Sequence, residues 1–192
     1  MVKNSNNMHK AVDRLKENPL IAYPQLSPMY NYAKDKHDAT GAKRKHSGDD
    51  YWMHPSGVAD LAVAFGGDET EIQVAMAHDT LEDTSATYEE LADQFGEDIA
   101  AYVQEITNDK DEVVALGKEG YINQELLSIS HPALFVKLCD ILYNCIDYPS
   151  EEQLERMARN VQYLVKKRED LDDRELDLID EILTTYKMAS KE

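Results

Sequence analysis

The chain has 192 residues, of which 42% are hydrophobic and 30% charged, so it can fold as one domain with its own core. Its 20 Lys and Arg residues are outnumbered by 38 Asp and Glu residues, and the net charge of -18 argues against non-specific binding to nucleic acid, which needs a broad basic surface. No apolar run approaches the roughly 18–20 residues that span a bilayer, and the N-terminus lacks the apolar stretch of a signal peptide, so we expect no membrane partner.

The apolar pattern predicts helices throughout, because no segment alternates with the period of two that is typical of strands. Ser27-Pro28 is expected to cap and open a helix, and Thr87–Glu90 and Ser150–Gln153 are capping boxes. Gly66-Gly67 and Gly96 are expected to end helices. The predicted helices cover residues near 12–20, 28–36, 55–65, 68 or 70 to 79, 87–95, 97–106, 112–128, 132–147, 150–167 and 173–188.

These elements predict a single all-α domain of about eight to ten helices over residues 1–192. Its core is expected over residues 28–147, and the C-terminal helices of residues 150–189 are expected to pack on that core. Residues 37–52 are polar and are predicted to form a loop. This loop carries a local basic cluster, Lys43 to His46, which could attract a phosphate compound at short range despite the acidic protein around it.

The two cysteines, Cys139 and Cys145, fall in one predicted helix. Their spacing places them about 9 Å apart along the helix axis, at about 1.5 Å per residue, which is too far for a disulfide. We therefore expect a protein of a reducing, cytoplasmic compartment.

Metal-type ligands occur at separated places, at His54, His78, Asp79 and Asp140. Two imidazoles and two carboxylates suit a first-row divalent ion such as Mn²⁺ or Fe²⁺, whereas a thiolate cluster would select zinc. Each residue alone is more simply interpreted as a helix cap or a solvent-facing group.

The stretch from His78 to Asp83 is unusually rich in acids. At helical spacing His78 shares a face with Glu82, and Asp79 shares one with Asp83. The apolar run at residues 74–77 indicates that the His78-Asp79 pair is buried, and buried charge needs a partner or a metal. The simpler interpretation is an acidic, frayed helix end.

The predicted helix over residues 132–147 is apolar nearly all round, which indicates a buried helix. Its polar residues Lys137, Asp140, Asn144 and Asp147 fall within about one quarter of the circumference. Such a stripe on a buried helix is costly unless it lines a site, and the alternative is that it faces solvent.

An ordered set of motifs resembles the HD-domain hydrolases of the Rel/Spo type, and among them the stand-alone small alarmone hydrolases, the group that includes the animal SpoT homologue. The motifs are His54-Pro55, His78-Asp79-x-x-Glu82-Asp83-Thr84, Thr87-x-x-Glu90-Leu91-x-x-x-Phe95-Gly96, Thr107-Asn108-Asp109-Lys110 and Val136-Lys137-Leu138-x-Asp140-x-Leu142-Tyr143-Asn144. The match runs from about Tyr32 to Asn144. The resemblance implies the all-α HD fold.

The resemblance also implies a site and a reaction. One divalent metal, usually Mn²⁺, would be held by His54, His78, Asp79 and Asp140. Glu82 and Asp83 would position and activate a water molecule. The reaction would remove the 3′-pyrophosphate of the nucleotide (p)ppGpp and release GDP or GTP. The implied substrate-binding residues are Arg44, Lys45, Lys110, Asn144, Arg159 and Tyr163.

The sequence departs from the family pattern in two places. The loop of residues 44–53 is altered where the family usually has a small turn and Pro-Tyr before the His, which bears on base recognition. Ile146 stands where an Arg is common, which removes one possible phosphate contact.

Other functions use the same metal core. An HD phosphohydrolase could act on the 2′-phosphate of NADPH, on a dNTP or on a modified tRNA 3′ end, because fold and metal do not determine the substrate. A module of another class would bind a nucleotide without turnover or act as an antitoxin. The sequence leaves the oligomeric state open.

Overall fold

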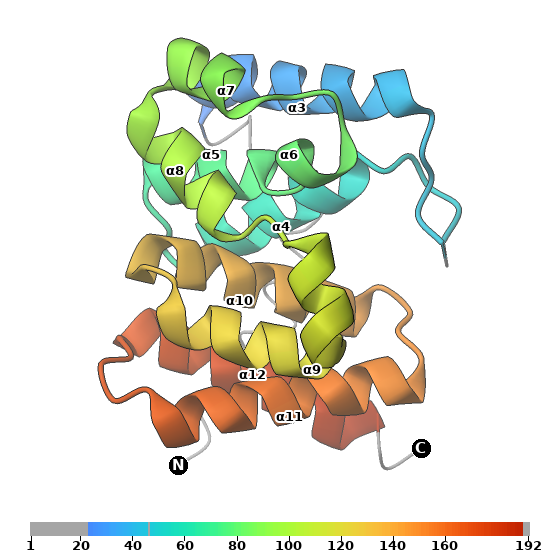
Figure 1. The fold of residues 1–192 in the computed structure, drawn as a ribbon, viewed down its shortest axis with the longest axis vertical. Helices are drawn as coiled ribbons and strands as arrows, with labels where there is room; N and C mark the ends of the chain where they lie inside the picture. The colour runs from blue at the N-terminus through green and yellow to red at the C-terminus, as the bar shows by residue number, and fades with distance from the viewer. Residues whose placement is uncertain (1–22, 46, 190–192) are drawn as a thin grey trace.

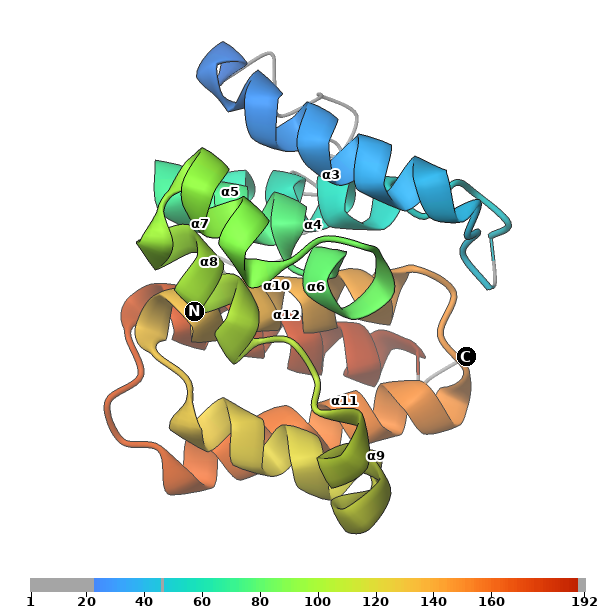
Figure 2. The same cartoon turned by 45° about the horizontal axis from the view of Figure 1, so that its top comes forward.

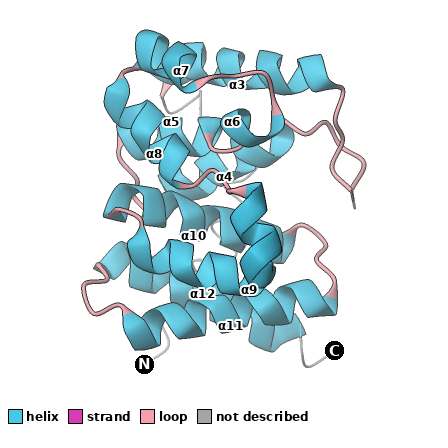
Figure 3. Cartoon of the chain, in the orientation of Figure 1, coloured by secondary structure: helices cyan, strands magenta, loops and turns pink. Residues whose placement is uncertain are grey.

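The computed structural model describes residues 23–45 and 47–189. The predicted helix near residues 12–20 and His46 of the basic cluster lie outside these ranges. Within them the chain forms helices joined by loops, with no strand and with one isolated bridge between Lys43 and Asp50 (Figure 3). The predicted all-α fold is therefore confirmed.

The elements follow one another in the order η1 (Pro24–Leu26), α3 (Ser27–Thr40), α4 (Met53–Ala64), α5 (Glu69–Ala77), α6 (Thr80–Asp83), α7 (Tyr88–Phe95), α8 (Glu97–Glu105), α9 (Lys110–Ser128), α10 (His131–Ile146), α11 (Glu151–Lys167) and α12 (Asp173–Ala189). None of the described helices is long and apolar enough to cross a membrane.

Helix α10 lies in the middle of the molecule, between α3–α8 on one side and α9, α11 and α12 on the other (Figure 1, Figure 2). It packs against α4, α5, α8, α11 and α12. Leu134, Phe135 and Leu138 of α10 are fully buried, and burial of each such side chain stabilises the fold by about 1.5–3 kcal/mol. Cys139 and Cys145 are free and buried on the same helix. The apolar sequence of this helix thus makes it the centre of the core.

The helix ends follow the caps that the sequence predicts, with one exception. The capping boxes Thr87–Glu90 and Ser150–Gln153 are both present. Ser27 is not the cap of α3: the 3-10 turn η1 precedes it, Leu26 takes the cap position, and the Ser27 hydroxyl donates to the Pro24 carbonyl at 2.7 Å. The Ser27 hydroxyl is thus bonded to the preceding turn and not to an N–H group of α3.

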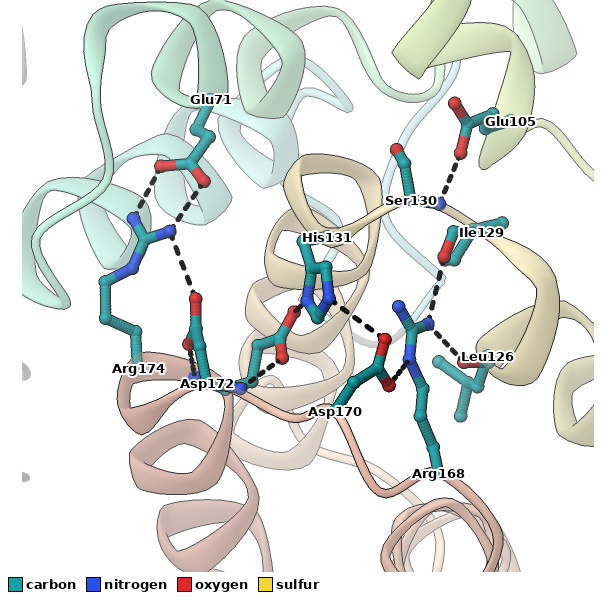
Figure 4. A network of polar contacts seen from close by, with 11 residues as sticks. Glu71, Glu105, Leu126, Ile129, Ser130, His131, Arg168, Asp170, Asp172 and Arg174 are labelled. Carbon is teal, nitrogen blue, oxygen red and sulfur yellow. Dashed lines mark hydrogen bonds and ion pairs between the residues drawn. The ribbon is translucent and has the colours of Figure 1, made fainter.

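The start of α12 is tied to α5 and α10 by buried carboxylates (Figure 4). Arg174 donates to both carboxylate oxygens of Glu71, at 2.7 and 3.0 Å. His131 contacts Glu175 at 2.8 Å and Asp170 at 3.1 Å, and the hydrogen bond with Glu175 raises the pKa of His131 although burial opposes its charge. Glu71 and Glu175 are buried, and their contacts with Arg174 and His131 offset the energetic cost of burying a carboxylate.

Helices α4 and α10 approach closely at Gly57, three residues after His54. A Cβ atom at Gly57 would lie 2.0 Å from Cε2 of Tyr143 on α10. The Tyr143 ring in turn packs edge-on against the His54 ring, with 5.1 Å between the ring centroids. The missing side chain of Gly57 therefore lets α10 place the Tyr143 ring against His54.

We expect Gly57→Ala to destabilise the protein by about 1–3 kcal/mol, because the Tyr143 ring must move out of a packed position. Gly120→Ala in α9 is the matched control, since its Cβ would meet only Leu116 Cβ at 3.6 Å and Ala is the better helix former by about 0.5–1 kcal/mol. Urea unfolding midpoints measure both effects. Equal or higher midpoints for both variants would contradict this account of the α4–α10 packing.

Candidate metal centre and its cavity

The predicted metal ligands come from three elements of the core. His54 is the second residue of α4, and Asp140 lies near the middle of α10. The sequence predicts His78 and Asp79 inside a helix, but α5 ends at Ala77 and the pair forms the turn before α6. The Thr80 hydroxyl donates to the Ala77 carbonyl at 2.6 Å and so closes the end of α5. The turn directs both side chains toward α4 and α10.

The side chains of these four residues converge. His54 Nε2 lies 3.1 Å from Asp140 Oδ1 and 3.6 Å from Asp79 Oδ2. His78 Nε2 lies 3.2 Å from Asp79 Oδ1 and 3.8 Å from Asp140 Oδ1. The ligand atoms of His54, His78 and Asp140 all lie within 4.8 Å of one another. The structure thus brings His54, His78 and Asp140 to one point and places the Asp79 carboxylate beside both imidazoles.

The orientation of His78 suits a bound cation. His78 Nδ1 lies 2.8 Å from the Ala75 carbonyl, which can only accept, so Nδ1 donates a hydrogen bond there and Nε2 is the nitrogen that faces the Asp79 and Asp140 carboxylates. Nε2 of His78 is buried and has no hydrogen-bond partner among the described residues. This orphaned nitrogen and the two carboxylates fit a first-row divalent ion.

The charges of the cluster compensate one another. Burial opposes the charge of His78, but the Asp79 and Asp140 carboxylates outweigh it and raise the pKa of His78 to about 9. Burial likewise opposes ionisation of Asp140, yet the His54 hydrogen bond and the imidazole charges lower its pKa to about 2. The pKa of Asp79 also lies well below its usual range, because His78 outweighs the effect of burial. Both carboxylates are therefore ionised at neutral pH.

The two predicted catalytic acids lie on α6, directly after the turn. Glu82 is half-buried, and its Oε2 accepts hydrogen bonds from the Asn108 backbone at 3.2 Å and from the Asn108 side chain at 2.6 Å. Asp83 is exposed. Burial is the main cause that raises the pKa of Tyr51, and the charges of Asp79 and Asp83 add to it. The structure therefore fixes the orientation of Glu82 more firmly than that of Asp83.

A cavity of about 330 Å³ opens beside Asp140. Its walls carry six cationic residues and two carboxylates, although the whole protein has a charge of -18. The cations are Lys43, Arg44, Lys45, Lys118, Lys137 and Arg156. The cavity is thus a local basic site that borders Asp140, one of the four predicted ligands.

The polar stripe predicted on α10 lines this cavity, because Lys137, Asp140, Asn144 and Asp147 are all among its wall residues. Arg44 donates from Nε to Asp147 at 2.8 Å and from Nη2 to Asn144 at 3.0 Å. Asn144 donates to Asp140 Oδ1 at 2.6 Å. A chain of hydrogen bonds therefore joins the cationic wall to one of the ligands.

Of the predicted substrate-binding residues, Arg44, Lys45 and Asn144 line the cavity. The other three are not among its wall residues. Lys110 is exposed at the start of α9, Arg159 donates to both carboxylate oxygens of Glu119, at 3.0 and 2.9 Å, and Tyr163 is exposed. Helix geometry explains the last two, because α11 turns a different face toward the cavity.

That face of α11 carries Gln153, Arg156, Met157 and Asn160, spaced by three or four residues. Lys118 of α9 also lines the cavity. None of these residues is predicted from the sequence as part of the site. The helical spacing alone was visible in the sequence, but it does not say which face of α11 points inward.

Comparisons with known proteins identify similar sequences and a similar structure. A family model described as HD domain matches residues 30–115. The guanosine-3′,5′-bis(diphosphate) 3′-pyrophosphohydrolase of Aquifex aeolicus is 36% identical over 134 residues, which is 67% of this chain and 19% of that protein. The chain thus spans about a fifth of the length of that relative.

Animal relatives match over most of their length. The guanosine-3′,5′-bis(diphosphate) 3′-pyrophosphohydrolase MESH1 of Danio rerio is 38% identical over 125 residues, which is 64% of this chain and 68% of that protein. A solved structure, of a metazoan ortholog of SpoT that hydrolyzes ppGpp, gives a TM-score of 0.67 at 25% identity and covers 83% of this chain and 93% of that chain. The resemblance predicted from the motifs is confirmed, and the chain belongs to the HD-domain family that includes the MESH1 proteins.

Proposed function

We propose that the chain is a metal-dependent hydrolase that removes the 3′-pyrophosphate of guanosine tetraphosphate or pentaphosphate and releases GDP or GTP with pyrophosphate. The observation that carries the proposal is a cationic cavity that opens beside Asp140, which belongs to a cluster of two imidazoles and two carboxylates. The names of the Aquifex and zebrafish relatives support the same substrate.

His54, His78, Asp79 and Asp140 would hold the metal, because a donor set of nitrogen and oxygen without sulfur suits a first-row divalent ion. We propose Mn²⁺, which is the ion that the family resemblance implies. When bound there, a divalent ion supplies Lewis acidity toward a phosphoryl oxygen and lowers the pKa of water.

Glu82 is the stronger candidate for the group that accepts a proton from the attacking water. Both Asn108 hydrogen bonds go to Oε2, so Oε1 is left free among the described residues while the carboxylate is held in one orientation. A general base must lie within hydrogen-bond reach of the proton it removes, and a fixed carboxylate meets that need better than a mobile one. Asp83 would assist from the same helix turn.

The cations of the cavity would neutralise the charge that develops on the leaving pyrophosphate. Arg44 presents a planar guanidinium, which suits the two oxygens of a phosphate group. Lys45 and Lys118 also line this cavity. At such short range these charges outweigh the acidic field of the whole protein, which salt screens over about 8–10 Å.

The proposal is tested by a substrate panel of ppGpp, NADPH and a dNTP, each incubated with the purified protein and Mn²⁺ and resolved by chromatography. We expect GDP and pyrophosphate from ppGpp, with slower or no turnover of the others. Release of phosphate from NADPH, hydrolysis of the dNTP with ppGpp left intact, or binding of ppGpp without turnover would each contradict it.

Mutations distinguish the role of a metal ligand from that of the general base Glu82. We expect Asp140→Ala to lose both Mn²⁺ binding and activity, because it removes an oxygen that contacts both imidazoles. Glu82→Gln should keep Mn²⁺ binding and reduce kcat by about 100-fold or more, because the amide cannot accept the proton. Calorimetry with Mn²⁺ and steady-state kinetics measure the two effects. An Asp140→Ala protein with full activity would refute the ligand assignment.

The position of the cavity favours Arg156 of α11 as a substrate-binding residue, whereas the sequence resemblance favours Arg159. We expect Arg156→Gln to raise KM for ppGpp by about tenfold or more, because a charge-assisted hydrogen bond contributes about 1.5–3 kcal/mol. Arg159→Gln is the matched comparison, since Arg159 is half-exposed and paired with Glu119, and it should change KM less. A larger rise in KM for Arg159→Gln than for Arg156→Gln would restore the prediction from the resemblance.

A further inference from the structure

Tyr51 joins the loop before α4 to the cluster of ligands. It lies three residues before His54 and lines the cavity. Its hydroxyl donates a hydrogen bond to Asp79 Oδ2 at 2.9 Å. Asp79 Oδ2 is also the oxygen that lies 3.6 Å from His54 Nε2, whereas Oδ1 lies 3.2 Å from His78 Nε2. The hydroxyl therefore sits where it can fix the rotation of the Asp79 carboxylate.

The Tyr51 ring is held on several sides. The His37 ring stacks on it with 5.1 Å between centroids and 29° between planes. The Arg44 guanidinium lies over the ring at 5.7 Å, and the His54 ring meets it edge-on at 6.0 Å. A ring confined in this way has little freedom to swing its hydroxyl away from Asp79.

His37 supports the ring as a packing surface rather than as a hydrogen-bonding group. It is 1% exposed, and both of its ring nitrogens lack a hydrogen-bond partner among the described residues. Burial lowers the pKa of His37, so the ring is held uncharged against Tyr51. His37 of α3 thus helps to hold the Tyr51 ring in place, and the Tyr51 hydroxyl in turn bonds Asp79.

We infer that Tyr51 is a positioning residue: its hydroxyl holds the Asp79 carboxylate so that one oxygen faces each imidazole, ready to bind a divalent ion. This inference rests on the proposed metal centre. Hydrogen bonds to ligating side chains orient them before the metal arrives, and their loss commonly weakens metal binding by about 10–100-fold. The same ring lies under Arg44, so one residue links the metal centre to the cationic wall.

The test is Tyr51→Phe, which keeps the ring and its stack on His37 and removes only the hydroxyl. Tyr143→Phe is the matched control, because the Tyr143 ring also packs on His54 but its hydroxyl has no hydrogen bond to a ligand in the described part of the chain. Calorimetric titration of the metal-free proteins with Mn²⁺ gives the affinity, and their melting temperatures without metal report on folding.

We expect Tyr51→Phe to bind Mn²⁺ about 10–100-fold more weakly, while Tyr143→Phe stays within about twofold of the parent protein. Both should melt near the parent temperature, and excess Mn²⁺ should restore most of the kcat of Tyr51→Phe. Equal affinity of the parent and Tyr51→Phe would overturn the inference and leave the proposed metal centre standing. A parent protein that binds no divalent ion would overturn both.

Discussion

The structure depends on the mutual compensation of two carboxylates and two imidazoles in the core. Asp79 and Asp140 contact His54 and His78 at distances of 3.1–3.8 Å, and each would be costly to bury alone. The compensation works only if α4, the turn after α5 and the middle of α10 meet at one point. The apolar packing around α10 brings them there, and the missing side chain of Gly57 allows the close contact. The packing of the core and the geometry of the site therefore depend on each other.

The charge distribution explains how an acidic protein can act on a polyphosphate. Six of the 20 Lys and Arg residues line one cavity, where they face two carboxylates. The remaining acidic surface acts at longer range, where salt screens it. Inside the cavity the cations act at contact distance, although the charge of Lys137 is already compensated by Glu125 at 3.2 Å. A bound phosphate would therefore experience the local cations more strongly than the net charge.

Much of the fold could be predicted from the sequence, because the helices carry their own start and stop signals. The capping boxes at Thr87 and Ser150 are local, so the structure realises them as expected. The convergence of His54, His78, Asp79 and Asp140 was anticipated from residue types and motifs. The inward face of α11 was not, because it depends on how α11 packs against α9 and α12. Arg156 and Asn160 are therefore not predicted from the sequence as cavity residues. The prediction of Arg159 rests on the family resemblance alone.

The central claim is that these four side chains bind one divalent ion. The most direct measurement is anomalous diffraction at the manganese absorption edge from crystals grown with Mn²⁺. The account predicts one strong peak within coordination distance of Nε2 of both histidines and of a carboxylate oxygen of each aspartate. A peak elsewhere, or a map without one at this point while manganese is present at saturating concentration, would contradict it.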